Sequence, residues 1–197
     1  RVPAHAPVAG VVIENLVLDG NAAANPGDWT DFTVSAVHLT NVVDSAVRNV
    51  TVRDSVGDGI SIQAGANNCV ENCLIEGARA HGIHLGTGVK DSRVAGNTSR
   101  QSGRNGFYFC FEVTRTIVTG NLFEENRYHG IGGLGDGGLN GDRYNLVEKN
   151  VCRRNGRHGI EAYRGADNII SHNLCRDNSQ EASGQYSGIS LVDTLRT

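Results

Sequence analysis

Asparagine returns at a regular interval along this chain, each time beside a short apolar run. The seven positions are Asn15, Asn49, Asn72, Asn97, Asn121, Asn150 and Asn173, and the intervals between them are 34, 23, 25, 24, 29 and 23 residues. A second mark follows most of them after about ten residues, a glycine and then a large apolar residue: Gly59-Ile60, Gly82-Ile83, Gly106-Phe107, Gly130-Ile131, Gly159-Ile160 and, after a longer gap, Gly188-Ile189. Such a period is typical of a solenoid, in which equivalent positions of successive repeats become neighbours in space.

The residues between these marks predict strands. Apolar and polar residues alternate in short runs, as in 11–18, 47–52 and 59–63, and Gly, Asn, Asp and Ser separate the runs. No segment keeps apolar residues at helical spacing over three turns, which excludes leucine-rich, ankyrin, TPR and HEAT repeats. The sequence therefore predicts an all-β, single-stranded right-handed parallel β-helix of about seven turns. It forms one domain over residues 1–197, with trimming at one or both ends left open.

We expect the seven asparagines to form one column at a tight corner of this solenoid. Asparagine tolerates left-handed backbone geometry, and amides stacked on successive turns can hydrogen-bond to one another. Cys152 and Cys175 each lie two residues after an asparagine of this pattern, so we expect them on adjacent turns. We predict two free buried thiols there, with a disulfide as the alternative.

Three segments resemble the parallel β-helix repeat proteins of the pectate-lyase-like superfamily: residues 117–123, His129-Gly130-Ile131 and residues 150–160. The resemblance covers roughly residues 10–192. It implies the β-helix fold and a secreted or cell-surface location. The superfamily includes polysaccharide lyases, alginate epimerases, glycoside hydrolases, phage tailspikes and proteins without catalysis, so the fold does not select one activity.

Alginate epimerases of this superfamily carry a Tyr-Gly-Phe-Asp-Pro-His motif on an early turn. Leu18-Asp19-Gly20-Asn21 and residues 157–160 look like parts of such enzymes. In the stretch that corresponds to the motif, residues 56–63, Ser61 and Gln63 stand where the motif has Asp and His. The motif's catalytic residues are therefore not carried over to this chain.

Charge and hydropathy exclude some partners. The net charge is −3 with both signs mixed along the chain, and no basic stripe is present, so we expect no nucleic-acid partner. No apolar run approaches the roughly 18 residues of a transmembrane helix, so we expect no membrane span. The expected partner is a polysaccharide substrate, and the chain is a monomer or a homo-oligomer.

The strand after each Gly-apolar mark is the expected place for chemistry. Side chains there alternate between core and solvent, and the residue before each glycine forms a second column. Four of the seven histidines fall in these two columns. The candidate catalytic residues are His84, Tyr108, His129, His158 and Glu161, and the candidate substrate-binding residues are Asp58, His81, Asn105, Arg157, Tyr163, Arg164 and Trp29.

The chemistry of these residues suits an acidic polysaccharide. Histidine changes protonation near neutral pH, and arginine can neutralise a substrate carboxylate and so acidify the neighbouring C–H group. The competing interpretation is structural, because a repeat multiplies whichever residue fits its corner.

Insertions interrupt the period and are the expected walls of a groove at residues 21–33 and 132–142. The first contains Trp29, a platform for a sugar ring or a cover for the solenoid end. The second is rich in glycine, and Asp136 and Asp142 are weak candidates for Ca²⁺ ligands. No cofactor is required for the expected chemistry. A third extension, residues 179–186, precedes the last Gly-apolar mark.

The favoured function is proton abstraction from an acidic polysaccharide, leading to β-elimination or epimerisation. One alternative is a glycoside hydrolase that uses Glu161 with a second carboxylate, Asp136 or Asp193. The other is a non-catalytic glycan-binding or structural β-helix such as a tailspike-like module.

Overall fold

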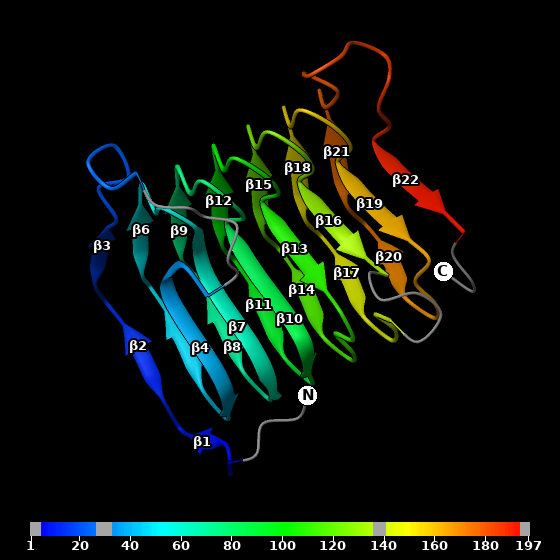
Figure 1. Cartoon of the computed structure of the whole chain (residues 1–197). Helices are drawn as coiled ribbons and strands as arrows, with labels where there is room; N and C mark the ends of the chain where they lie inside the picture. Colours follow the sequence, from blue (N-terminus) through cyan, green and yellow to red (C-terminus); the bar gives the residue numbers. More distant parts are fainter. Residues whose placement is uncertain (1–4, 27–32, 136–140, 194–197) are drawn as a thin grey trace.

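A computed structural model describes residues 5–26, 33–135 and 141–193 of this chain. These residues form 22 strands in three parallel sheets, which wind around one apolar interior as a parallel β-helix (Figure 1). Seven turns contribute one strand to each sheet, and an eighth strand ends the longest sheet. The predicted all-β solenoid of about seven turns is confirmed. Within the described ranges no helix is long and apolar enough to cross a membrane.

The three sheets take successive strands of each turn. Sheet A contains β1 (Val8–Ala9), β4 (Ser35–Val43), β7 (Asp58–Ala66), β10 (Ile83–Lys90), β13 (Phe107–Cys110), β16 (Ile131–Leu134), β19 (Ile160–Tyr163) and β22 (Ile189–Val192). Sheet B contains β2 (Val12–Glu14), β5 (Ala46–Arg48), β8 (Cys69–Glu71), β11 (Arg93–Ala95), β14 (Ile117–Thr119), β17 (Leu146–Glu148) and β20 (Ile169–Ser171). Sheet C contains β3 (Val17–Asp19), β6 (Thr51–Arg53), β9 (Leu74–Glu76), β12 (Thr98–Arg100), β15 (Leu122–Glu124), β18 (Val151–Arg153) and β21 (Leu174–Arg176).

The Gly-apolar marks set the register of sheet A. Ile60, Ile83, Phe107, Ile131 and Ile160 are Cα partners on successive strands, and all five side chains are fully buried. Each apolar side chain therefore packs on its equivalents one turn away. Truncating one of them to alanine would cost about 2–5 kcal/mol, because the stacked neighbours cannot collapse into the gap.

The asparagines occupy two adjacent columns, so the prediction of a single column is wrong. Asn15, Asn49 and Asn72 follow the sheet B strands directly and have φ of 57°, 50° and 55°. From the fourth turn onward Asn97, Asn121, Asn150 and Asn173 lie one residue later, and Gly96, Gly120, Lys149 and His172 take the left-handed position. The first set adopts the left-handed backbone geometry expected of asparagine at a corner. The second set stacks its amides on successive turns.

The second column is a continuous ladder of hydrogen bonds inside the corner. Asn121 is buried, and its Oδ1 accepts the backbone N–H of Asn97 at 2.9 Å. Its Nδ2 donates to the carbonyl of Val94 at 3.0 Å and to Oδ1 of Asn150 at 2.9 Å. The same arrangement recurs at Asn150. The ladder satisfies corner backbone groups that would otherwise be buried without partners.

The cysteines follow the same stacking. Cys152 and Cys175 are Cα partners on β18 and β21, with Cys152 fully buried and Cys175 half-buried. All five cysteines are free thiols. Burial raises the pKa of Cys152 well above its ordinary value, which keeps this thiol protonated.

Candidate functional site

The outer face of sheet A gathers the predicted polar column. Ser61, His84, Tyr108 and Gly132 are Cα partners on β7, β10, β13 and β16. Further along the same face, on β19 and β22, Glu161 pairs with Ser190. The register predicted for this column is therefore confirmed.

The residues that precede the glycines form a hydrogen-bonded ladder along the edge of this face. Oδ1 of Asp58 accepts the backbone N–H of His81 at 2.9 Å, and Oδ1 of Asn105 accepts that of His129 at 3.1 Å. Nδ1 of His129 accepts the N–H of His158 at 3.2 Å. The side chains of Asp58, Asn105 and His129 thus each have a structural role, whatever else they do.

Asp58, His81, His84 and Tyr108 form a compact cluster on three successive turns. Nδ1 of His84 lies 2.7 Å from Oδ2 of Asp58, and both side chains are buried. The His81 ring stacks on Tyr108, with centroids 4.2 Å apart and an interplanar angle of 7°. The edge of His84 faces the Tyr108 ring at 5.1 Å between centroids.

The Asp58 contact fixes the tautomer of His84. An ionised carboxylate can accept hydrogen bonds but cannot donate them. Nδ1 of His84 therefore carries the proton and donates a hydrogen bond to Asp58. The lone pair of the neutral ring is then on Nε2, which is buried and has no hydrogen-bond partner among the described residues. The result is a histidine whose basic nitrogen is held in place and uncommitted.

His81 supports the cluster as a neutral ring. Burial lowers the pKa of His81 well below its ordinary value, and the nearby His84 and Arg104 add to this effect. A neutral imidazole stacks on the Tyr108 ring without bringing a charge into a buried site. Arg104 was not among the predicted residues, although Arg104-Asn105-Gly106 has the same form as Arg157-His158-Gly159.

Gly133 leaves space for the aromatic ring of this cluster. It has a φ of +76°, and a Cβ there would lie 2.3 Å from Cε2 of Tyr108. This glycine therefore permits Tyr108 to lie across the neighbouring strand.

A second polar cluster lies two to three turns further along sheet A. The rings of His129 and His158 are parallel, with centroids 5.2 Å apart and an interplanar angle of 4°. Nε2 of His129 lies 3.6 Å from Oε1 of Glu161, a contact longer than a direct hydrogen bond. One nitrogen of each ring and a carboxylate oxygen of Glu161 all lie within 4.8 Å of one another, a spacing that could hold a metal ion.

The backbone determines which nitrogen of these two rings is protonated. Nδ1 of His129 accepts from His158, and Nδ1 of His158 accepts the N–H of Ser187 at 2.8 Å. In the neutral rings the proton is therefore on Nε2. Burial, followed by the nearby His158 and Arg157, lowers the pKa of His129 to about 3. An Nε2 that carries a proton has no lone pair for a metal ion, so the ladder disfavours metal binding here.

The extension before β22 packs against this second cluster. Nε of Arg157 donates to Oε2 of Glu181 at 2.7 Å, and its guanidinium lies over the Tyr128 ring at 4.0 Å. The Tyr186 ring meets the edge of His158 at 5.2 Å between centroids. In Figure 1 this extension rises above β19 and β22.

The remaining predicted residues lie elsewhere or outside the described ranges. Tyr163 ends β19 and Arg164 follows it; the Arg164 guanidinium lies over the Tyr163 ring at 4.8 Å, and its Nε lies 3.9 Å from Oδ2 of Asp193. Trp29 and Asp136 fall outside the described residues, so the platform and calcium predictions at those positions stay predictions. Asp142 is fully buried, and its carboxylate accepts the N–H groups of Val113 and Gly135 at 2.7 and 2.8 Å.

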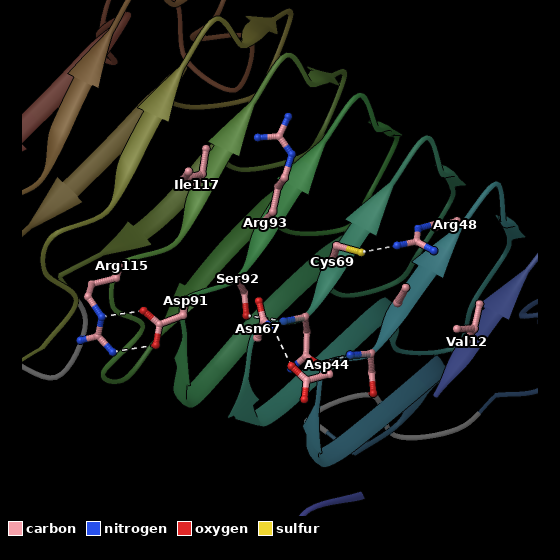
Figure 2. A pocket seen from close by; sticks show the side chains of 13 residues that line it. Val12, Asp44, Arg48, Asn67, Cys69, Asp91, Ser92, Arg93, Arg115 and Ile117 are labelled. Carbon is pink, nitrogen blue, oxygen red and sulfur yellow. Dashed lines mark hydrogen bonds and ion pairs between the residues drawn. The ribbon is translucent and has the colours of Figure 1, made fainter. Parts of the chain in front are cut away.

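A hollow of about 670 Å³ lies on a different face, over sheet B (Figure 2). Its arginines are paired with acids, Arg115 with Asp91 at 2.6 Å and both Arg48 and Arg93 with Glu71. Nη2 of Arg48 lies 3.3 Å from Sγ of Cys69 in the same hollow. We place the candidate site on sheet A instead, because that face holds the histidines and the buried Asp58–His84 pair.

Comparisons with known proteins agree with this architecture. The model of the right-handed β-helix region matches residues 35–195. No curated protein matches the sequence. The periplasmic alginate epimerase AlgG superposes with a TM-score of 0.62 at 14% identity, over 94% of this chain and 45% of that one. This chain therefore spans less than half the length of AlgG.

A second solved structure gives a similar result. The A-module of the mannuronan C-5 epimerase AlgE6 from Azotobacter vinelandii superposes with a TM-score of 0.54 at 13% identity. The superposition covers 91% of this chain and 71% of the module. At these identities the likeness establishes the fold alone.

Proposed function

The chain belongs to the right-handed β-helix family, and on that premise we propose that it acts on an acidic polysaccharide by abstracting a proton beside a uronate carboxylate. The observation that supports this proposal best is the buried Asp58–His84 pair, which leaves Nε2 of His84 as an oriented base. The outcome is epimerisation if a proton returns to the same carbon, and β-elimination if the neighbouring glycosidic oxygen leaves.

His84 is the proposed base because Asp58 holds its Nδ1 at 2.7 Å and leaves its Nε2 without a partner among the described residues. After Nε2 takes a proton the ring is cationic, and the Asp58 carboxylate at 2.7 Å offsets that charge. Asp58 also holds the ring orientation, as the carboxylate does in other histidine–carboxylate pairs. Both groups are buried, so their interaction is screened little by salt.

Tyr108 is the proposed second proton-transfer group. Its ring lies beside His84 on the next turn and is only half-buried, so a sugar lying on sheet A could approach it. A phenol can donate a proton to the opposite face of the reacting carbon or to a leaving oxygen. The stack on His81 fixes the plane of the ring.

Arg104 is the proposed partner of the substrate carboxylate. It directly precedes Asn105 of the ladder, and its charge, after burial and His84, contributes to lowering the pKa of His81. Neutralising the carboxylate makes the adjacent proton more acidic and stabilises the enolate-like intermediate. The likeness to alginate epimerases supports a uronate as the substrate class and an extracytoplasmic location.

The test is to incubate the protein with alginate, pectate, glycosaminoglycan and neutral glycans in deuterated water. Ultraviolet absorbance would detect an unsaturated product, and NMR would detect deuterium at the carbon beside the carboxylate. We expect one of these signals with an acidic glycan, and we expect His84→Gln and Tyr108→Phe each to reduce it by about a hundredfold or more. Ser190→Ala, at the far end of the same face, is the matched control.

Two results would contradict the proposal. New reducing ends without an unsaturated product or exchange would indicate hydrolysis, and attention would move to Glu161. Glycan binding with no chemical change would indicate a non-catalytic binding module, with the ladder residues serving the fold alone.

A further inference from the structure

The second polar cluster offers hydrogen-bonding groups of a defined kind. The ladder assigns the protons of neutral His129 and His158 to Nε2, so both rings present donors and no acceptor at that atom. Glu161 presents a carboxylate, and about a third of its side chain is exposed. Donor and acceptor thus lie side by side on the outer face of sheet A.

The side chains of this cluster differ in how far they are exposed to solvent, and so to a ligand. The His129 side chain is only 7% exposed and its Nε2 lies 3.6 Å from Oε1 of Glu161, so we assign it the role of positioning Glu161. His158 is half-buried, and its ring is fixed from two sides, by the stack on His129 and by the edge contact with Tyr186. His158 and Glu161 are therefore the groups that a ligand would meet.

The charges around the cluster disfavour an anionic ligand. The neighbouring cations are matched by acids, Arg157 by Glu181 at 2.7 Å and Arg164 by Asp193 at 3.9 Å. Glu161 itself adds a negative charge, and the neutral His129 ring does not offset it. A second carboxylate placed here would be repelled.

We propose that His158 and Glu161 form a subsite for the hydroxyl groups of a sugar, with His129 as a positioning residue. The subsite lies three strands from His84 along sheet A, roughly 14 Å at the strand spacing. This inference rests on the proposed function, because the same glycan would occupy both sites. A hydroxyl can donate to the Glu161 carboxylate and accept from the His158 Nε2–H, which matches this pair of groups.

The test measures binding without turnover. Titration calorimetry on a His84→Gln background would compare an oligomannuronate long enough to span both sites with its carboxyl-reduced counterpart, a neutral oligomannose. We expect Glu161→Gln to weaken both ligands by similar factors of about ten, because a charge-assisted hydrogen bond is lost from each. We expect His158→Asn to weaken both as well.

The second variant separates binding from folding. Asn105 shows that asparagine can accept the backbone N–H in this column, so His158→Asn keeps that hydrogen bond while it removes the imidazole ring with its Nε2–H donor. Unchanged thermal unfolding together with weaker binding is the expected combination.

Four outcomes would overturn the subsite. They are unchanged binding in both variants, tighter binding of the uronate alone in Glu161→Gln, tighter binding when Zn²⁺ is added, and failure of wild type to bind either oligomer. The second would mean that the site receives a carboxylate, and the third that it is a metal site. The fourth would also remove mannuronate from the substrates of the proposed function, whereas the first three would leave that function intact.

Discussion

Replacing His129 by asparagine is expected to make the stability of this protein less sensitive to acid. In the folded chain His129 is buried, and its Nδ1 accepts the N–H of His158. Protonating that nitrogen would remove the acceptor and place a charge in a desolvated position. The pKa of His129 is accordingly lowered from 6.5 to about 3.

The size of the effect follows from linkage between protonation and folding. Because the folded-state pKa is lowered, the unfolded chain binds the proton first as the pH falls. His129 therefore costs nothing well above pH 6.5, and it destabilises the fold progressively between pH 6.5 and pH 3. At pH 4.5 the two units below the unfolded pKa correspond to about 3 kcal/mol.

The assay is urea unfolding at pH 7 and at pH 4.5, followed by circular dichroism. Asparagine keeps the acceptor, as Asn105 does one turn earlier, but it does not titrate. We expect the loss of unfolding free energy between the two pH values to shrink by about 3 kcal/mol in His129→Asn. His172→Asn, at an exposed corner, controls for loss of an imidazole. Parallel pH dependence in wild type and His129→Asn would refute the reasoning.

Four further predictions concern the corners and the sheet A face. Asn121→Ala should lower the unfolding free energy by about 2–4 kcal/mol in urea titrations, because it orphans buried backbone groups. Asn49→Ala, at an exposed left-handed position, should cost only about 1 kcal/mol. Gly133→Ala should destabilise the fold by more than about 1 kcal/mol. It should also broaden the aromatic NMR signals of the neighbouring Tyr108 ring. Arg157→Ala should release Glu181, which limited proteolysis of residues 179–186 would detect, with a stability change under about 1 kcal/mol.

The apolar register was predictable from the sequence because the interior of the solenoid accepts few side chains. At Ile60, Ile83 and Phe107 each core position must be apolar and must face its equivalent one turn away. A glycine precedes each of them, at a point where the backbones of successive turns lie close together. Two independent constraints at adjacent residues leave one alignment of the turns.

The asparagine register was not predictable in the same way. Two adjacent positions at this corner favour asparagine for different reasons, left-handed backbone geometry at Asn72 and an amide ladder at Asn97. The 25-residue interval between them is one residue longer than the 24 that separate the Cα partners Cys69 and Arg93. Only the pairing of the strands reveals that the two asparagines are not equivalent.

The sequence predicts which face of the solenoid carries the candidate site, but it does not predict which side chains on that face contact one another. Sequence spacing places His84 in the outward column and Asp58 in the column before the glycines, yet it gives no reason for them to meet across one turn. Side-chain rotamers decide that contact. The assignment of protons on His129 and His158 likewise depends on backbone N–H groups of the following turn.

The buried carboxylate of Asp142 has a consequence for how this solenoid can change. It holds the N–H of Gly135, where the strand of sheet A ends, and the N–H of Val113, one turn earlier. Immediately afterwards, at the corner between sheets A and B, Asn145 accepts the N–H of Thr116, as Thr116 accepts that of Ser92 one turn earlier. The chain is thus returned to register by two side chains, however many residues separate Gly135 from Asp142. Loops of other lengths and compositions could be exchanged between these two residues without altering the strands, which makes this corner a position for grafting new glycan contacts.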